Sequence, residues 1–200
     1  MIENSFLESG FSFTMAKLIP YIVIILIGLC LVFLLRNKLK FKNRLLTFFV
    51  RLIVVAIPFG IYFGFNPIYE GDFSNGAIRF ARNAKTTELD DHKLYVIAIP
   101  GCKHCAQAMS RMLQLKERNP DMEIEYIVCS SDSSNTKPYQ DLGQGKIEVS
   151  MAENSSEMAK LANNSYPSFV LSEHGKTLIT WNNDGFGVRA LDQVEASTKN

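Results

Sequence analysis

Residues 94–118 read LYVIAIPGCKHCAQAMSRMLQLKER, and this stretch decides the fold. Its first six residues form an apolar run of β-forming side chains, which predicts a short strand. Pro100-Gly101 ends that run. The residues from Cys102 to about Arg118 are typical of a helix, so two cysteines separated by two residues, Cys102 and Cys105, lie where a strand turns into a helix.

This placement favours redox chemistry at the cysteine pair. The first turn of a helix offers unpaired N–H groups and the positive end of the helix dipole, both of which stabilise a thiolate. The thiolate is the nucleophilic form of cysteine, and the spacing allows Cys102 and Cys105 to close and reopen a disulfide. Lys103 and His104 add positive charge, or a group that can become positive, beside the pair.

The chain after this helix predicts an α/β domain. A strand over residues 122–129 follows the helix, so strand, crossover helix and strand form a parallel pair. On the helix, Ala106, Met109, Met112 and Leu113 are spaced as a buried face. The remaining expected elements are a loop over 130–145, a strand or loop over 146–150, a helix over 154–162 with Asn154 as N-cap, a hairpin of 166–172 and 177–181, and a helix over 188–196.

The first 67 residues predict a membrane anchor. Residues 18–35 carry no charge, and residues 45–65 carry only Arg51 near their start, so each run is long enough to span a bilayer. The loop 36–44 between them is strongly basic, which places it on the cytoplasmic side, or against anionic lipid headgroups on that same side. The alternatives are a cleaved signal peptide for the first run and a buried soluble helix for the second.

Charge divides the chain at the same place. Residues 1–67 hold seven Lys or Arg and two Asp or Glu, whereas residues 68–200 hold fourteen and eighteen. The net charges are therefore +5 and −4. A mildly acidic second part does not favour binding to nucleic acid.

The element order resembles the thioredoxin fold: a CxxC pair opens the first crossover helix, a proline stands at the head of the next hairpin, and a helix closes the domain. With the anchor, the chain is similar to membrane-tethered, extracytoplasmic thiol-disulfide oxidoreductases of the TlpA/ResA-like and Dsb-like groups. The resemblance implies that Cys102 is the exposed nucleophile and Cys105 the resolving thiol. It also implies that Pro167 is cis and that Tyr166 presents backbone to an extended substrate peptide.

Two positions depart from the thioredoxin pattern. Gly101 stands where an aromatic residue, often Trp, precedes the first cysteine, and Val96 stands where thioredoxin has a buried carboxylate. The proton acceptor for Cys105 is therefore open, with water or His104 as candidates. The direction of electron flow is open too, because His104 before the second cysteine is similar to the oxidising Dsb pattern, whereas anchored TlpA-like domains often act as reductants.

Other readings of the cysteines and histidines remain. The CxxC pair can be a static disulfide. Alternatively, the domain can be a thioredoxin-like binding module without turnover, which holds a partner or delivers copper bound by Cys102, Cys105 and His174. Cys129 is expected to be a buried apolar thiol, and Cys30 a packing or lipid-facing residue in the first span. His174, in the hairpin turn, is by default solvated, and Pro167 can also be a trans proline that starts a strand.

Taken together, the sequence predicts a two-helix transmembrane hairpin (1–67), a tether (68–91) with a short helix around residues 77–84, and a thioredoxin-like domain (92–200). The expected function is thiol-disulfide exchange with extracytoplasmic, periplasmic protein thiols or disulfides and a redox partner protein. Cys102 and Cys105 are the expected catalytic residues, Lys103 and His104 tune them, and Tyr166 and Pro167 bind substrate. We expect no cofactor besides the disulfide and no metal. The chain is expected to cross the cell (inner) membrane twice, with both termini outside the cytoplasm.

Overall fold

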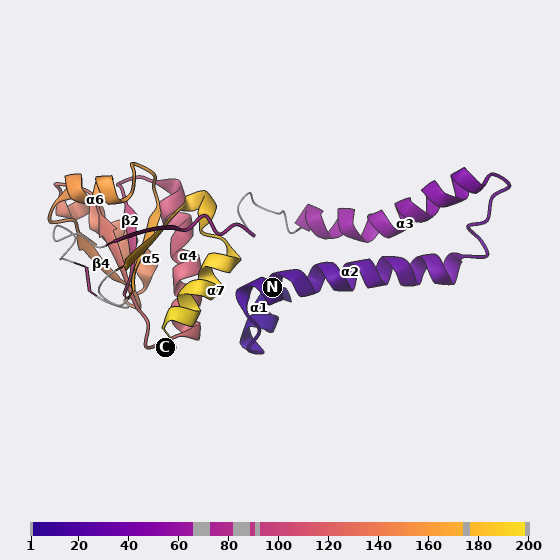
Figure 1. The fold of residues 1–200 in the computed structure, drawn as a ribbon, viewed down its shortest axis with the longest axis horizontal. Helices are drawn as coiled ribbons and strands as arrows, with labels where there is room; N and C mark the ends of the chain where they lie inside the picture. The colour runs from indigo at the N-terminus through magenta and orange to yellow at the C-terminus, as the bar shows by residue number, and fades with distance from the viewer. Residues whose placement is uncertain (1, 66–72, 82–88, 91–92, 174–176, 199–200) are drawn as a thin grey trace. The chain divides into compact units, whose positions relative to one another are not determined.

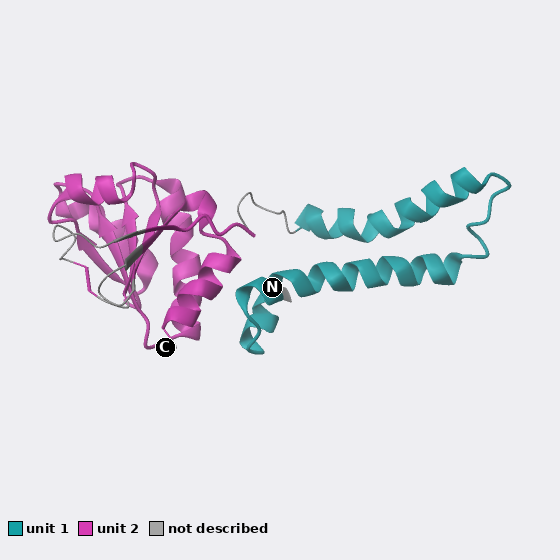
Figure 2. Ribbon diagram, viewed as in Figure 1, with its two compact units in different colours: residues 1–70 teal, residues 71–200 magenta. Residues whose placement is uncertain are grey.

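The computed structural model describes the chain except for residues 1, 66–72, 82–88, 91–92, 174–176 and 199–200. The chain divides into two compact units, Met1–Glu70 and Gly71–Asn200, which Figure 2 shows in different colours. Each unit has its own set of elements, and each is described by itself below.

The first unit is a helical hairpin preceded by a short helix. Helix α1 covers Ile2–Glu8, α2 covers Phe13–Leu35 and α3 covers Arg44–Phe65. Helix α2 begins five residues earlier than expected, because the Ser12 side chain caps it by accepting a hydrogen bond from the Met15 N–H. Both α2 and α3 are long and apolar enough to cross a membrane.

Small and aromatic side chains hold α2 against α3. A Cβ atom on Gly28 would lie 3.1 Å from both the Cα and the carbonyl oxygen of Val55, so the two backbones approach closely there. Nearer the open end of the hairpin, where α2 begins and α3 ends, the Tyr21 ring packs on the rings of Tyr62 and Phe63, with centroids 5.9 and 5.6 Å away. Close backbone approach at a glycine is typical of helix pairs within membranes.

The second unit is built on one six-stranded sheet with the strand order β1-β6-β5-β2-β3-β4. The pairs β2·β3 and β3·β4 are parallel, whereas β2·β5, β5·β6 and β1·β6 are antiparallel. The strands are β1 (Ile78–Ala81), β2 (Lys93–Ala98), β3 (Glu123–Val128), β4 (Glu148–Met151), β5 (Ser168–Glu173) and β6 (Thr177–Asn182). The helices are α4 (Lys103–Arg118), α5 (Lys137–Gly143), α6 (Ser155–Leu161) and α7 (Val188–Ser197), with short 3₁₀ turns η2 (Ser133–Thr136) and η3 (Asn183–Gly185).

These connections confirm the expected fold class. Strand β2, helix α4 and strand β3 form the predicted parallel crossover unit, and β5 and β6 form the predicted antiparallel pair. Helix α7 then closes the domain, with Leu191 and Val194 buried as expected. The unit is a mixed α/β, thioredoxin-like domain whose central sheet is flanked by helices (Figure 1).

Helices cover both faces of the sheet because alternate residues of each strand point to opposite faces. Tyr95, Ile97 and Val170 form a buried cluster with Met158 and Ala162 of the α6 segment on one face. Helices α4 and α7 lie next to each other on the other face (Figure 1), joined by an ion pair of 3.1 Å between Arg118 and Glu195.

Three local predictions are wrong. The short helix expected near residues 77–84 is not formed at 78–81, because these residues pair with β6 as strand β1. The loop expected over 130–145 contains η2 and α5. On α4, Ala106 and Leu113 are half-buried instead of buried, whereas Cys105, Ala108 and Leu115 join Met109 and Met112 in the core.

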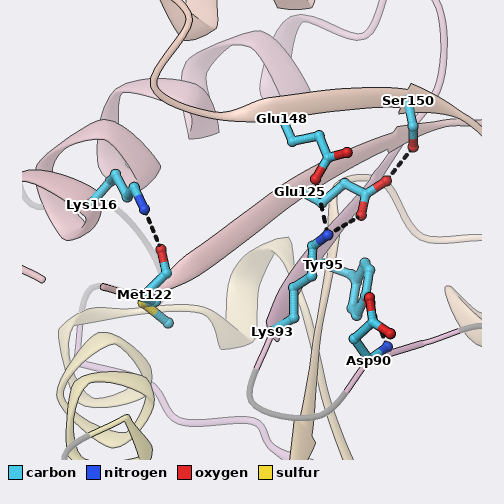
Figure 3. Close-up of polar contacts among 8 residues, drawn as sticks. All are labelled: Asp90, Lys93, Tyr95, Lys116, Met122, Glu125, Glu148 and Ser150. Atoms are coloured by element: carbon cyan, nitrogen blue, oxygen red, sulfur yellow. Dashed lines mark hydrogen bonds and ion pairs between the residues drawn. The ribbon is translucent and has the colours of Figure 1, made fainter. Parts of the chain in front are cut away.

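The N-terminal end of β2, away from the CxxC pair, carries a polar network, which Figure 3 shows; Lys93 and Glu125 are largely buried, whereas the Glu148 side chain is exposed. The Lys93 ammonium lies 2.7 Å from a carboxylate oxygen of Glu125 and 3.0 Å from one of Glu148. The Ser150 hydroxyl donates to Glu125, so adjacent side chains from β2, β3 and β4 satisfy one another. Lys93 is the first residue of β2, and the CxxC pair follows the last, so this network stabilises the sheet away from the cysteines.

Candidate redox site

Cys102 and Cys105 form a disulfide at the beginning of α4, with their Cα atoms 5.2 Å apart. Cys102 is the N-cap residue of the helix, and its sulfur accepts a hydrogen bond of 3.1 Å from the Cys105 N–H. A sulfur in this position lies at the positive end of the helix dipole. Once the disulfide is reduced, the dipole stabilises the Cys102 thiolate.

The two cysteines differ in access. Cys102 is half-buried, whereas Cys105 has 0% of its surface exposed. Attack from outside on the disulfide is therefore easier at Cys102, and Cys105 is placed to act within the chain. This difference in access is what an exchange through one exposed sulfur requires.

Two tyrosines hold the backbone around the pair, and the sequence analysis did not single them out. The Tyr139 hydroxyl, from α5, donates a hydrogen bond of 2.7 Å to the carbonyl oxygen of Ile99, three residues before Cys102. The Tyr126 hydroxyl, from β3, donates to the Cys105 carbonyl at 3.4 Å, and the two tyrosine rings stack with centroids 5.9 Å apart.

Burial fixes the protonation of these tyrosines. Burial raises the pKa of Tyr139, although a hydrogen bond with the Cys102 backbone opposes the shift. Burial also raises the pKa of Tyr126, which is fully buried beside Cys105. Both phenols are therefore neutral near pH 7, and they act as hydrogen-bond donors and not as proton acceptors.

The space beneath the pair is aromatic and apolar. Val96, at the position where thioredoxin has a buried carboxylate, pairs with Tyr126 on one side and Phe169 on the other. All three residues are fully buried. The cross-strand neighbours of Val96 therefore offer no carboxylate to accept a proton from Cys105.

Strand register brings Tyr166 and Pro167 to the same edge of the sheet as the pair. Ile97, near the end of β2, pairs with Ser168, which directly follows Pro167. The Tyr166–Pro167 peptide bond is cis. Pro167 is buried and Tyr166 is half-buried, packed with Cys129 against the cluster on the α6 face.

Cys129 lies near this edge but is poorly suited to exchange. Its N–H donates a hydrogen bond of 2.8 Å to the Ala98 carbonyl, which places it just beyond the end of β3. Burial raises the pKa of its thiol. A thiol that holds its proton is a weak nucleophile near neutral pH. Cys129 was expected to be buried, but it is half-buried and packs at the margin of the cluster on the α6 face.

Lys103 and His104 project from the first turn of α4 and are both exposed. Both side chains are therefore accessible to a partner. His174, which the copper-binding hypothesis needs, lies outside the described residues, as does His92. Among the residues that the structure describes, no three His, Cys, Asp or Glu side chains gather as potential metal ligands.

No protein-family model and no curated protein matches the chain. Among solved structures, it is similar to a secreted disulfide oxidoreductase of Mycobacterium tuberculosis that is homologous to E. coli DsbE. That match has 14% identity and a TM-score of 0.38, and it covers 53% of this chain and 82% of the other. A thioredoxin-like protein from Bacteroides caccae matches at 12% identity with a TM-score of 0.37.

The second match covers 72% of this chain but only 55% of the Bacteroides protein. At such identities and scores, neither match adds to what the coordinates show. The thioredoxin-like fold, with a CxxC disulfide at its first crossover helix, rests on the strand order and connections described above.

Proposed function

We propose that this chain is a membrane-anchored thiol-disulfide oxidoreductase that exchanges a disulfide between the Cys102–Cys105 pair and extracytoplasmic protein thiols. One observation carries the proposal: the disulfide caps the N-terminus of α4 with the Cys102 side half-exposed and the Cys105 side buried. A disulfide with a purely structural role does not need one accessible and one buried cysteine.

The exchange proceeds in two displacements, written here for the oxidised chain. A thiolate of the partner attacks the Cys102 sulfur, the Cys102–Cys105 bond breaks, and Cys105 leaves as a thiolate that takes up a proton. A second partner thiolate attacks the partner sulfur of the mixed disulfide and releases Cys102 as a thiolate. The partner loses two electrons and two protons and gains a disulfide, and the chain gains a dithiol.

Helix α4 and its neighbours favour the departure of Cys102 in the second displacement. The N-terminal dipole stabilises the thiolate, Lys103 adds positive charge on the exposed side, and we assign His104 to tuning the pair from the same helical turn. A stabilised thiolate makes the reduced form more favourable and the disulfide more oxidising. We assign Tyr166 and Pro167 to substrate binding, because strand register places them at the same edge of the sheet as the pair.

The anchor is supported by α2 and α3, which expose large apolar side chains such as Leu26, Phe33 and Leu34 at 59, 63 and 73%. A contiguous exposed apolar surface is typical of a membrane or protein interface, and the length of both helices favours the membrane. The basic residues between the helices favour the cytoplasmic side for that loop, which puts the second unit on the opposite side of the membrane, where disulfides persist.

Cys102→Ser in the full chain, reconstituted in lipid vesicles, tests the activity. We expect reduction of insulin by the chain, with dithiothreitol as electron source, to fall to the rate without protein. Cys129→Ser, which removes a cysteine outside the pair, is expected to retain the activity. Unchanged insulin reduction by Cys102→Ser would contradict the proposal.

Two further measurements address the direction and the compartment. A reduction potential of the pair of about −120 mV indicates an oxidant of proteins, and one of about −270 mV indicates a reductant. Labelling of single introduced cysteines with a membrane-impermeant reagent in whole cells locates the unit: we expect labelling in residues 177–198 and none in residues 36–44. Labelling of both segments from the same side would contradict an extracytoplasmic location of the second unit.

A further inference from the structure

Arg51 is the single charged residue in the apolar run of α3, residues 45–65. It follows Arg44, the first residue of the helix, by seven positions, which corresponds to about 10 Å along the helix axis. A charge at that depth in a bilayer is costly unless it reaches water or pairs with a group of opposite charge. The Arg51 guanidinium therefore needs such a partner, and its position in the hairpin limits what that partner is.

Arg51 lies on the side of α3 that faces α2. Gly28 of α2 meets Val55, and Arg51 precedes Val55 by one turn, on the same side of α3. Continuing this antiparallel register toward the loop between the helices places Arg51 opposite Val32 of α2. Arg51 and Val32 are both half-buried, whereas the next residue, Leu52, is exposed. Arg51 therefore belongs to the seam between α2 and α3 and not to the outer surface of the hairpin.

The seam leaves part of this guanidinium without an acceptor. The Nε atom of Arg51 is buried, and among the residues that the structure describes it has no hydrogen-bond partner. The sequence from 13 to 65 contains no Asp or Glu, and the two acidic residues before α2, Glu3 and Glu8, lie in α1, ahead of the open end of the hairpin. The spans of a second copy therefore offer no carboxylate either, so the counter-ion comes from another molecule.

The end of the seam next to Arg51 is strongly basic. The Thr47 hydroxyl holds the loop to the beginning of α3, because it accepts a hydrogen bond of 3.1 Å from the Phe41 N–H and donates one of 3.1 Å to the Asn43 carbonyl. The positive end of the α3 dipole lies at this same end. Five exposed cations therefore stay near the mouth of the seam: Arg36, Lys38, Lys40, Lys42 and Arg44.

A phospholipid phosphate is the anion that suits this position. A helical side chain leans toward the N-terminus of its helix, so the Arg51 side chain leads toward the loop 36–44 and the level of the headgroups. A phosphate diester accepts two parallel N–H bonds from a guanidinium. The cations of the loop repel a headgroup that carries an ammonium, such as that of phosphatidylcholine, but they attract the headgroup of an anionic lipid.

We propose that the seam between α2 and α3 binds one anionic phospholipid from the leaflet next to the loop 36–44. The lipid phosphate pairs with the Arg51 guanidinium, and the headgroup lies among the basic side chains of the loop. This site is distinct from a general attraction of a basic loop to an anionic membrane, because it assigns one lipid to one arginine. The inference rests on the membrane anchor of the proposed function and does not depend on its redox chemistry.

The test measures which lipid stays on the full chain. The chain in an uncharged detergent is mixed with equal amounts of phosphatidylglycerol and phosphatidylcholine that have the same acyl chains. Native mass spectrometry in about 0.5 M ammonium acetate then identifies the retained lipid, since this salt screens exposed charges far more than a partly buried contact. We expect the wild type to retain one lipid and to favour phosphatidylglycerol about tenfold, as a charge-assisted hydrogen bond provides.

Three variants separate the seam site from the charge of the loop. Arg51→Leu removes the guanidinium, and we expect it to lose the tenfold preference. Arg44→Leu is the matched control, because it removes the same charge from an exposed position on the same helix, and we expect it to keep the preference. Arg51→Lys keeps the charge but lacks the planar fork, so we expect it to keep only part of the preference. This third variant also tests the site if Arg51→Leu fails to fold.

Three outcomes would overturn the inference. Equal retention of the two lipids by the wild type would show that the seam does not select an anionic lipid. Equal losses in Arg51→Leu and Arg44→Leu would indicate only the general attraction of the loop. Displacement of the lipid by an equal concentration of glycerol 1-phosphate would show that the site takes a soluble phosphate. The measurement needs no thiol-disulfide exchange, so each of these outcomes leaves the oxidoreductase proposal standing, and failure of insulin reduction would leave the lipid site standing.

Discussion

The indole N–H of Trp181 donates a hydrogen bond of 2.8 Å to the side-chain oxygen of Asn75, which lies 106 residues earlier in the chain. Trp181 is 1% exposed and lies in the middle of the domain core, next to Phe186. The bond therefore ties the segment that leads from the anchor to the central packing of the thioredoxin-like unit.

Asn75→Ala is expected to lower the free energy of unfolding of the second unit by about 1 kcal/mol, since the Trp181 N–H loses its protein partner but water can reach the exposed position of Asn75. The corresponding fall in Tm is about 4 °C. The chain has a single tryptophan, so fluorescence of Trp181 reports this unit alone. Gln140→Ala, an exposed change on α5, is the control. Equal midpoints for the two variants would contradict the role of Asn75.

Sequence patterns predicted the elements with strong local signals. The charge-free run of α2, the strand–CxxC–helix order and the closing helix α7 each follow from periodicity or composition within one segment. Two elements gave no such signal. Strand β1 has only four residues and is held by its pairing with β6, which comes about a hundred positions later.

The other missed element is α5. Its surroundings are rich in Ser, Asn, Asp and Gly, which are typical of a loop, and the helix has only seven residues. It is held by Tyr139, whose buried ring stacks on Tyr126 and whose hydroxyl bonds Ile99. Because these contacts join distant segments, the tyrosines around the candidate site could not be found from spacing, whereas the cysteines could.

Tyr139→Phe tests whether this tyrosine holds the CxxC loop. The variant keeps the stacked ring but removes the donor to the Ile99 carbonyl, so we expect a loss of about 1 kcal/mol in the free energy of unfolding. We also expect faster hydrogen exchange at the Cys102 amide, which donates to the same Ile99 carbonyl at 3.4 Å. Tyr166→Phe, a change at the same edge of the sheet, is the comparison. Unchanged exchange at Cys102 in Tyr139→Phe would show that the loop is held by other contacts.

Lys93→Met tests the network at the far end of β2. The change leaves the Glu125 carboxylate, 13% exposed, without its ammonium partner, so we expect a loss of about 2 kcal/mol in the free energy of unfolding. Lys93→Met with Glu125→Met is expected to recover part of that loss, because the uncompensated charge is removed. A double variant less stable than the single one would contradict this account.

The pH dependence of the Lys93 contribution follows from its partners. Burial alone would lower the pKa of Lys93, but the hydrogen bonds and charges of Glu125 and Glu148 outweigh it and raise the pKa above the ordinary value for lysine. The stabilisation by Lys93 is therefore complete at pH values below the ordinary pKa of lysine. It is lost only as the pH rises through the raised pKa of Lys93 in the folded chain. The difference in stability between wild type and Lys93→Met should be constant from about pH 6 to 9.

Tyr95 likewise loses its contribution to stability at alkaline pH. Burial raises its pKa to about 12, although the hydrogen bond from the Asp90 N–H and the charge of Lys93 oppose the shift. In the unfolded chain, a tyrosine side chain loses its proton at about pH 10. The protonated form is thus favoured in the folded state, and this contribution is present below about pH 10 and is lost as the pH rises through about 12.

Tyr95→Phe removes this titration together with the hydrogen bond from Asp90. At pH 8 we expect the variant to be less stable than wild type by about 1 kcal/mol, because the Asp90 N–H loses its partner at 2.6 Å. Between about pH 10 and 12 the wild type should lose stability more steeply than the variant, so that the gap narrows. Burial also raises the pKa of Tyr126 and Tyr139, but these groups are the same in both chains and cancel in the difference. Denaturant unfolding followed by Trp181 fluorescence at each pH measures the gap, and parallel curves across this range would show that Tyr95 is not the group responsible.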